Sequence, residues 1–224
     1  MPTTVISQPA AGRPQGRGEE LANAISHGVG VLASLAALPI LVSAALRGSS
    51  LRAGGMPAWP YAVFGLSLII LFSSSTIYHA LRAPGPKHIF RILDHSSIYI
   101  LIAGSYSAYS VCYLGGAKGW ILFGAEWAIA AGGLYLSATR IKKFRAAGTL
   151  IYLAMGWLIA PVFGEIRAAL PSESFALLVA GGLAYTVGVA FFAIKRVPYF
   201  HSIWHLFVLA GAACHVASLL IAAH

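Results

Sequence analysis

The chain contains seven apolar stretches that are each long enough to cross a lipid bilayer. The hydrocarbon core of a bilayer is about 30 Å thick, which an α-helix spans with about 20 residues. Only 9% of the 224 residues are charged and 58% are hydrophobic, whereas a soluble domain carries about 25% charged residues. Backbone groups in lipid must be satisfied internally, and no stretch alternates like a barrel strand. We therefore expect an all-α integral membrane protein, a seven-transmembrane helix bundle, with helices near 24–46, 58–82, 93–113, 119–138, 147–163, 174–194 and 201–222.

The amino-terminal residues differ in composition from the rest of the chain. Residues 1–18 are polar and rich in Pro and Gly, so we expect a flexible tail there and a membrane domain over 19–224. Within the apolar stretches, Gly132, Gly133, Gly181, Gly182 and Gly188 predict close packing between helices.

The basic residues predict the orientation, because loops on the cytoplasmic side of a membrane carry an excess of Lys and Arg. Eleven basic residues fall on the side of the amino terminus: Arg13, Arg17, Arg82, Lys87, Arg91, Arg140, Lys142, Lys143, Arg145, Lys195 and Arg196. Four fall on the other side: Arg47, Arg52, Lys118 and Arg167. We expect the amino terminus in the cytoplasm and the carboxy terminus outside the cell membrane. The formal charge of +9 does not indicate nucleic-acid binding, because the basic residues are dispersed and form no patch.

Three histidines predict a metal site. His201 and His205 are four residues apart and share one helix face. His79 ends the second stretch on the same predicted side of the membrane, so all three lie at one depth. Three neutral imidazoles with an open fourth position suit Zn²⁺, although ligand type alone leaves iron and copper open. The alternatives are an interfacial pair at 201 and 205 and a hydrogen-bonded polar residue at 79. His215 lies about 15 Å farther along the same helix and is not expected to join them.

Asp94 and Ser75 are the expected catalytic partners of this site. Asp94 is the one carboxylate near this layer, and it could accept a proton from water activated by the metal. It could instead orient a ligand histidine or pair with Arg91. Ser75 precedes His79 by one turn and could bond water or a substrate oxygen, or simply bond back to the carbonyl of Leu71.

Weaker candidates surround these residues. His27 and Asn23, one turn apart near the amino terminus, could support the site rather than bind the metal, and His95 is a minor candidate. Glu126 lies inside the fourth stretch, nearer the other membrane face, where it could pair with Lys118.

These residues lie in segments that resemble the hemolysin III family, prokaryotic relatives of the progestin and adiponectin receptors that are also similar to alkaline ceramidases. The resemblance covers about residues 19–222 and rests on the order and spacing of six segments: 19–28, 74–79, 93–106, 152–157, 181–186 and 199–205. It implies a seven-helix bundle with its amino terminus inside and a zinc ion near the cytoplasmic face. The family's Ser-x3-His pattern maps to Ser75 and His79, its Asp to Asp94, and its His-x3-His to His201 and His205. One departure is Ala108, where the family pattern has proline.

Three hypotheses for the function follow. The leading one is a zinc-dependent membrane hydrolase that cleaves an amide or ester bond of a lipid-like substrate, as the ceramidase likeness implies. The second is a seven-helix receptor or sensor in which zinc is structural. The third is a hemolysin-type pore-forming protein, which would have to oligomerise because no helix carries a hydrophilic stripe. The sequence leaves the substrate and the oligomeric state open.

Overall fold

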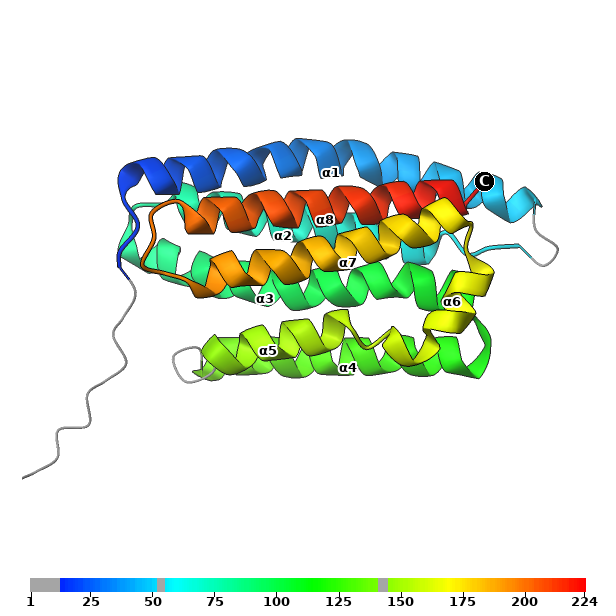
Figure 1. The fold of residues 1–224 in the computed structure, drawn as a ribbon. Helices are drawn as coiled ribbons and strands as arrows, with labels where there is room; N and C mark the ends of the chain where they lie inside the picture. The colour runs from blue at the N-terminus through cyan, green and yellow to red at the C-terminus, as the bar shows by residue number, and fades with distance from the viewer. Residues whose placement is uncertain (1–12, 52–54, 141–144) are drawn as a thin grey trace, which may run out of the picture.

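The structure is a computed structural model that describes residues 13–51, 55–140 and 145–224, and these residues form helices and no strands (Figure 1). In chain order the elements are α1 (Arg17–Leu51), α2 (Trp59–Ala80), α3 (Pro84–Ala108), η1 (Tyr109–Leu114), α4 (Gly116–Arg140), α5 (Arg145–Gly156), η2 (Ala160–Val162), α6 (Phe163–Ala169), α7 (Ser172–Ala193) and α8 (Phe200–Ala222). Seven helical segments in this part of the chain are long and apolar enough to cross a membrane. The predicted seven-helix membrane bundle is therefore confirmed.

Two helices begin earlier than hydropathy predicts. Helix α1 begins at Arg17 rather than near residue 24, and α3 begins at Pro84 rather than near 93. Glu19 and Glu20 in the first turn of α1 favour the helix through its dipole, and Pro84 suits a first helical position. Hydropathy reports only the part of a helix in contact with lipid, so it misses such polar first turns. Residues 1–12 of the expected tail, together with Arg52, Lys142 and Lys143, lie outside the described residues.

The range 147–163 predicted one continuous helix for the fifth apolar stretch. The structure shows instead that this stretch is broken. Helix α5 ends at Gly156, and the chain continues through the 3-10 turn η2 into α6. Pro161 lies in η2, and proline in a helix interior removes a hydrogen bond and clashes with the preceding turn. Together these pieces cover Gly148–Ala169, one membrane span.

Close packing of α7 on α8 confirms part of the glycine prediction. A methyl group at Gly181 would lie 2.3 Å from Cδ2 of His215, and one at Gly188 would lie 2.7 Å from Cβ of Phe207. A methyl group at Gly133 would lie 2.5 Å from the ring of Tyr99, whereas Gly132 and Gly182 have no neighbouring atom within 4 Å of such a group. In Figure 1, α8 lies beside α1 and α7, and the α4–α5 pair lies on the far side of α3.

One end of the bundle contains the starts of α1, α3 and α8 and the end of α2 (Figure 1). We call it the histidine end. The start of α8 is fixed to α1 at this end. Tyr199, just before α8, has a left-handed backbone with φ 60°, and its N–H donates to Oε1 of Glu19 at 2.8 Å. This contact holds the first turn of α8 against the first turn of α1.

Candidate metal centre

The three predicted metal-binding histidines come together at the histidine end. His79 lies in the last turn of α2, and His201 and His205 lie in the first two turns of α8. Their ligand atoms lie within 4.8 Å of one another. The ring centroids are 5.2 Å apart between His79 and His201, 5.1 Å between His79 and His205, and 4.8 Å between His201 and His205. This cluster could hold a metal ion.

One ring nitrogen of this cluster has a lone pair that no group of the described protein uses. Nδ1 of His79 lies 2.7 Å from a carboxylate oxygen of Glu20, which can only accept, so Nδ1 carries the hydrogen. The lone pair is then on Nε2, a buried atom with no hydrogen-bond partner among the described residues. A buried acceptor without a partner costs about 1–3 kcal/mol. A metal ion between the three rings would remove that cost.

Glu20 fixes the ring of His79 through its Nδ1 atom, a contact that the sequence did not predict. Its Oε2 accepts from His79 and its Oε1 accepts from Nζ of Lys87 at 2.8 Å. In metal sites, a carboxylate on the far nitrogen of a histidine ligand fixes the ring and makes it a stronger ligand. Glu20 and Lys87 therefore complete the surroundings of His79.

Asn23 and Ser26 do the same for His205. The ring Nδ1 of His205 lies 3.2 Å from Oγ of Ser26 and 3.3 Å from the carbonyl of Asn23. The carbonyl only accepts, so Nδ1 is a donor and Nε2 keeps its lone pair for a metal. The side chain of Asn23 is fully buried and accepts from Ser202 at 2.6 Å. Asn23 was predicted to support the site, and in the structure it contacts α8 in this way.

A periodic signal could have revealed this part of the site. Glu20, Asn23, Ser26 and His27 are spaced as polar residues on one side of α1, a helix that otherwise exposes apolar side chains such as Leu32. Residues three and four apart on a helix are neighbours. The expectation that no helix carries a hydrophilic stripe is therefore wrong for the first turns of α1, and a polar stripe within a membrane span indicates contact with other polar groups in the bundle.

Asp94 lies beside the three histidines at the start of the membrane part of α3. It lines a small cavity together with His27, His201 and His205. Its Oδ2 is 3.4 Å from Nδ1 of His95. The predicted alternative, a pair with Arg91, is not what the structure shows: the guanidinium of that residue points away and bonds the ring of His88 at 2.9 Å.

Ser75 is placed to act together with Asp94. Its hydroxyl lies next to the Asp94 carboxylate, and it is buried without a hydrogen bond of standard geometry in the described part of the chain. The expected competing bond to the carbonyl of Leu71 is made by Ser74 instead, at 3.0 Å. The hydroxyl of Ser75 can therefore turn to the Asp94 carboxylate or to a ligand beside it.

His27 also lies in the site, packed against the ring of His205. Its ring stacks on that of His205, with centroids 3.6 Å apart and an interplanar angle of 12°. Its two ring nitrogens are buried and have no hydrogen-bond partner among the described residues. The weaker sequence candidates His27, His95 and Asn23 thus all lie around the cluster.

Two other polar residues lie outside this site. Glu126 is fully buried in α4 and does not pair with Lys118, which lies 2.5 Å from Glu165 instead. His215 lies in α8 well beyond His205, as predicted, and its Nε2 is 3.3 Å from the carbonyl of Leu178.

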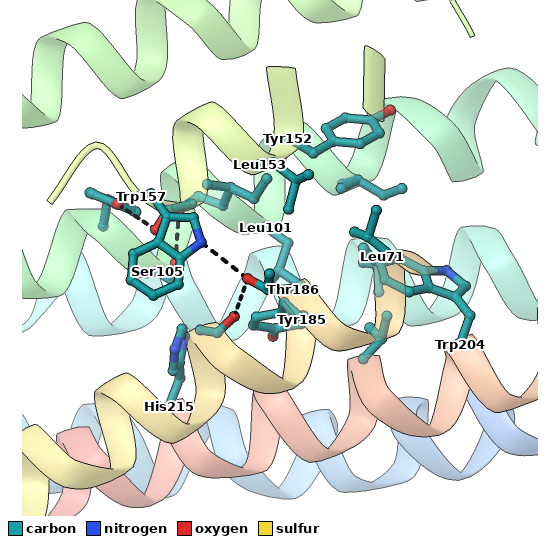
Figure 2. A pocket seen from close by; sticks show the side chains of 17 residues that line it. Leu71, Leu101, Ser105, Tyr152, Leu153, Trp157, Tyr185, Thr186, Trp204 and His215 are labelled. Carbon is teal, nitrogen blue, oxygen red and sulfur yellow. Dashed lines mark hydrogen bonds between the residues drawn. The ribbon is translucent and has the colours of Figure 1, made fainter. Parts of the chain in front are cut away.

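Two neighbouring cavities with shared lining residues lie beside the histidine cluster and in the interior of the bundle. The smaller, about 20 Å³, is lined by His27 and Asp94 among others. The larger, about 90 Å³, lies between α3, α5, α7 and α8 and is lined mostly by apolar side chains (Figure 2). Both are lined by Leu71 and Trp204, which Figure 2 shows at the end of the larger cavity opposite His215. The polar site therefore borders an apolar space.

Comparison with known proteins identifies the family. The family model described as "Haemolysin-III related" matches residues 16–216. The chain belongs to this family. Within it, "Hemolysin-3" of Bacillus cereus is 40% identical over 195 residues, which cover 87% of this chain and 87% of that protein. The "Hemolysin-3 homolog" of Bacillus subtilis (strain 168) is 40% identical over 198 residues, 87% of this chain and 90% of that protein.

A more distant relative is "Monocyte to macrophage differentiation factor" of Homo sapiens, 31% identical over 168 residues, 70% of this chain and 66% of that protein. No solved structure matches the chain. The hemolysin III resemblance is thus confirmed, and with the seven apolar helices it makes the chain a multi-pass protein of the cell membrane.

Proposed function

We propose that this protein is a zinc-dependent membrane hydrolase that cleaves an amide or ester bond of a lipid-like substrate. One observation carries the proposal: a cluster of three histidines with Asp94 and Ser75 beside it borders an apolar cavity inside a membrane bundle. Zn²⁺, held by His79, His201 and His205, would supply a Lewis acid that polarises a carbonyl and lowers the pKa of water.

Asp94 and Ser75 supply the proton chemistry and the positioning. The small cavity beside Asp94 measures about 20 Å³, and a cavity needs about 10–15 Å³ to hold one water molecule. Asp94 would accept a proton from a water molecule there and pass it to the leaving group. The hydroxyl of Ser75 would donate to that water or to the developing oxyanion.

The larger cavity explains why the substrate would be lipid-like. Its lining is largely apolar, with aliphatic and aromatic side chains such as Leu101, Leu153 and Trp204 (Figure 2). An acyl chain in this space would place a carbonyl group at the histidine end, since the two cavities adjoin there. The orientation predicted from the basic residues puts that end at the cytoplasmic face, level with lipid headgroups.

Purified, zinc-loaded protein should therefore release fatty acid from ceramides or from other long-chain amides and esters in mixed micelles. Fatty acid measured by mass spectrometry should rise with protein concentration and fall after chelation of the metal. Fully metal-loaded protein that releases no fatty acid from any long-chain amide or ester would contradict the proposal.

The name of the bacterial relatives, Hemolysin-3, favours a competing activity, the formation of pores. A pore would not depend on the metal centre. Leakage of dye from liposomes at low protein density that persists in His79→Ala would support a pore, whereas the hydrolase proposal expects no leakage from either protein.

A further inference from the structure

The polar stripe on α1 contains one residue whose contacts differ from those of the other three. Glu20, Asn23 and Ser26 each bond a metal-binding histidine or its neighbour in α8. His27 is the fourth member of the stripe and makes no hydrogen bond through either ring nitrogen in the described structure. Three residues of the stripe therefore hold the histidines of the cluster in place, and the fourth, His27, makes no such contact.

The ring of His27 is held firmly in place. One face stacks on His205 with centroids 3.6 Å apart, and Phe72 makes an edge contact with centroids 5.1 Å apart. Only 3% of the residue is exposed. A neutral imidazole always presents one N–H donor and one acceptor, so a polar group is fixed here beside His205.

His27 lies where it could contact a bound substrate, and it is outside the set of three histidines that could bind a metal. It lines the small cavity together with Asp94 and His201. It is not among the histidines whose ligand atoms lie within 4.8 Å of one another. Because its ring is parallel to that of His205, its nitrogens lie in a separate plane from the donor atom of that ligand.

We propose, on the basis of the hydrolase function above, that His27 donates a hydrogen bond to the carbonyl oxygen of the bound ligand. The ligand class this implies is an acyl compound with an oxygen acceptor at the reacting carbon. His27 would stabilise the negative charge that develops on this oxygen during hydrolysis, as preorganised donors do in acyl transfer. It binds no metal and transfers no proton.

Binding of two zinc-directed probes tests this role without relying on turnover. A long-chain alkyl hydroxamate presents a carbonyl oxygen, whereas the alkyl thiol of equal chain length ligates zinc without one. In zinc-loaded protein, His27→Phe keeps the stacked ring but removes the donor. We expect it to weaken hydroxamate binding by roughly 10-fold while thiol binding changes by less than about 2-fold, with His27→Gln recovering part of the loss.

Two controls make the result specific. Phe72→Leu alters the packing of the same ring without removing a donor, and it should leave the ratio of the two affinities unchanged. Metal content should be the same in His27→Phe and in the wild type. Equal weakening of both probes, no weakening of either, failure of both to bind the wild type, or loss of metal from His27→Phe would each overturn the proposal. A selective loss of hydroxamate affinity in a protein without hydrolytic activity would uphold the role of His27 and reject the hydrolase.

Discussion

Replacement of Asp94 by Asn should lower fatty-acid release about 10²–10⁴-fold, the range that a positioned general acid or base contributes, while zinc stays bound. Asparagine has nearly the same shape, but it cannot accept the proton. The three histidines that would hold the metal are untouched by the change. Turnover of a long-chain amide, measured together with zinc content by elemental analysis, checks both parts of this expectation.

A matched control lies elsewhere in the bundle. Glu126→Gln also neutralises a buried carboxylate, but one far from the histidine end, and it should leave turnover within about 2-fold of the wild type. Unchanged activity in Asp94→Asn would mean that the metal is structural and would favour the sensor hypothesis. Loss of zinc from Asp94→Asn would mean that Asp94 binds the metal instead of acting as a base.

Glu20→Gln should weaken zinc binding about 10- to 100-fold, the usual cost of losing a carboxylate that supports a histidine ligand. The glutamine can still accept from Nδ1 of His79, but it no longer carries the charge that makes the ring a better ligand. Titration with a competing chelator of known affinity measures the change. Turnover at saturating zinc should recover, because the catalytic groups remain in place.

The control for this variant is another glutamate paired with a lysine. Glu165→Gln removes the charge that lies 2.5 Å from Lys118, an exposed pair, and it should leave zinc affinity unchanged. An equal loss of affinity in both variants would indicate general destabilisation. Unchanged affinity in Glu20→Gln would show that the carboxylate contributes nothing to the metal centre.

Hydropathy and charge distribution were sufficient to predict the seven-helix architecture and to predict that the three histidines lie close together. The number of spans follows from lengths of apolar sequence, since lipid leaves a chain few alternatives to helices. Alternating helix direction then places the end of one span and the start of another at the same depth. For this reason His79, His201 and His205 could be predicted to converge although more than a hundred residues separate the first from the others.

Other parts of the site depend on the direction in which a side chain points. The depth of a residue in the membrane does not determine this direction. Asp94 could have paired with Arg91 on the basis of spacing, and only the packing of α3 shows that Arg91 bonds His88 instead. The contact of Glu20 with His79 depends on how α1 is rotated against α2. Rotation of this kind follows from the polar stripe as a whole rather than from any single motif.

The α5 break shows a different limit of the sequence. An apolar stretch of suitable length predicts one span, and the chain from Gly148 to Ala169 does form one. The effect of Pro161 on the course of the helix is local and leaves the hydropathy of the stretch unchanged. The wall that α5 contributes to the larger cavity, through Tyr152, Leu153 and Gly156, could not be anticipated from hydropathy.

The metal content of the purified protein tests the central claim most directly. After exposure to Zn²⁺ and removal of the excess, the wild type should hold about one zinc ion per chain, and His205→Ala should hold far less. Elemental analysis of both proteins, each first shown by size-exclusion chromatography to be folded, gives the answer. Wild-type protein without bound metal, or equal zinc in the two proteins, would contradict the claim that His79, His201 and His205 form a metal centre.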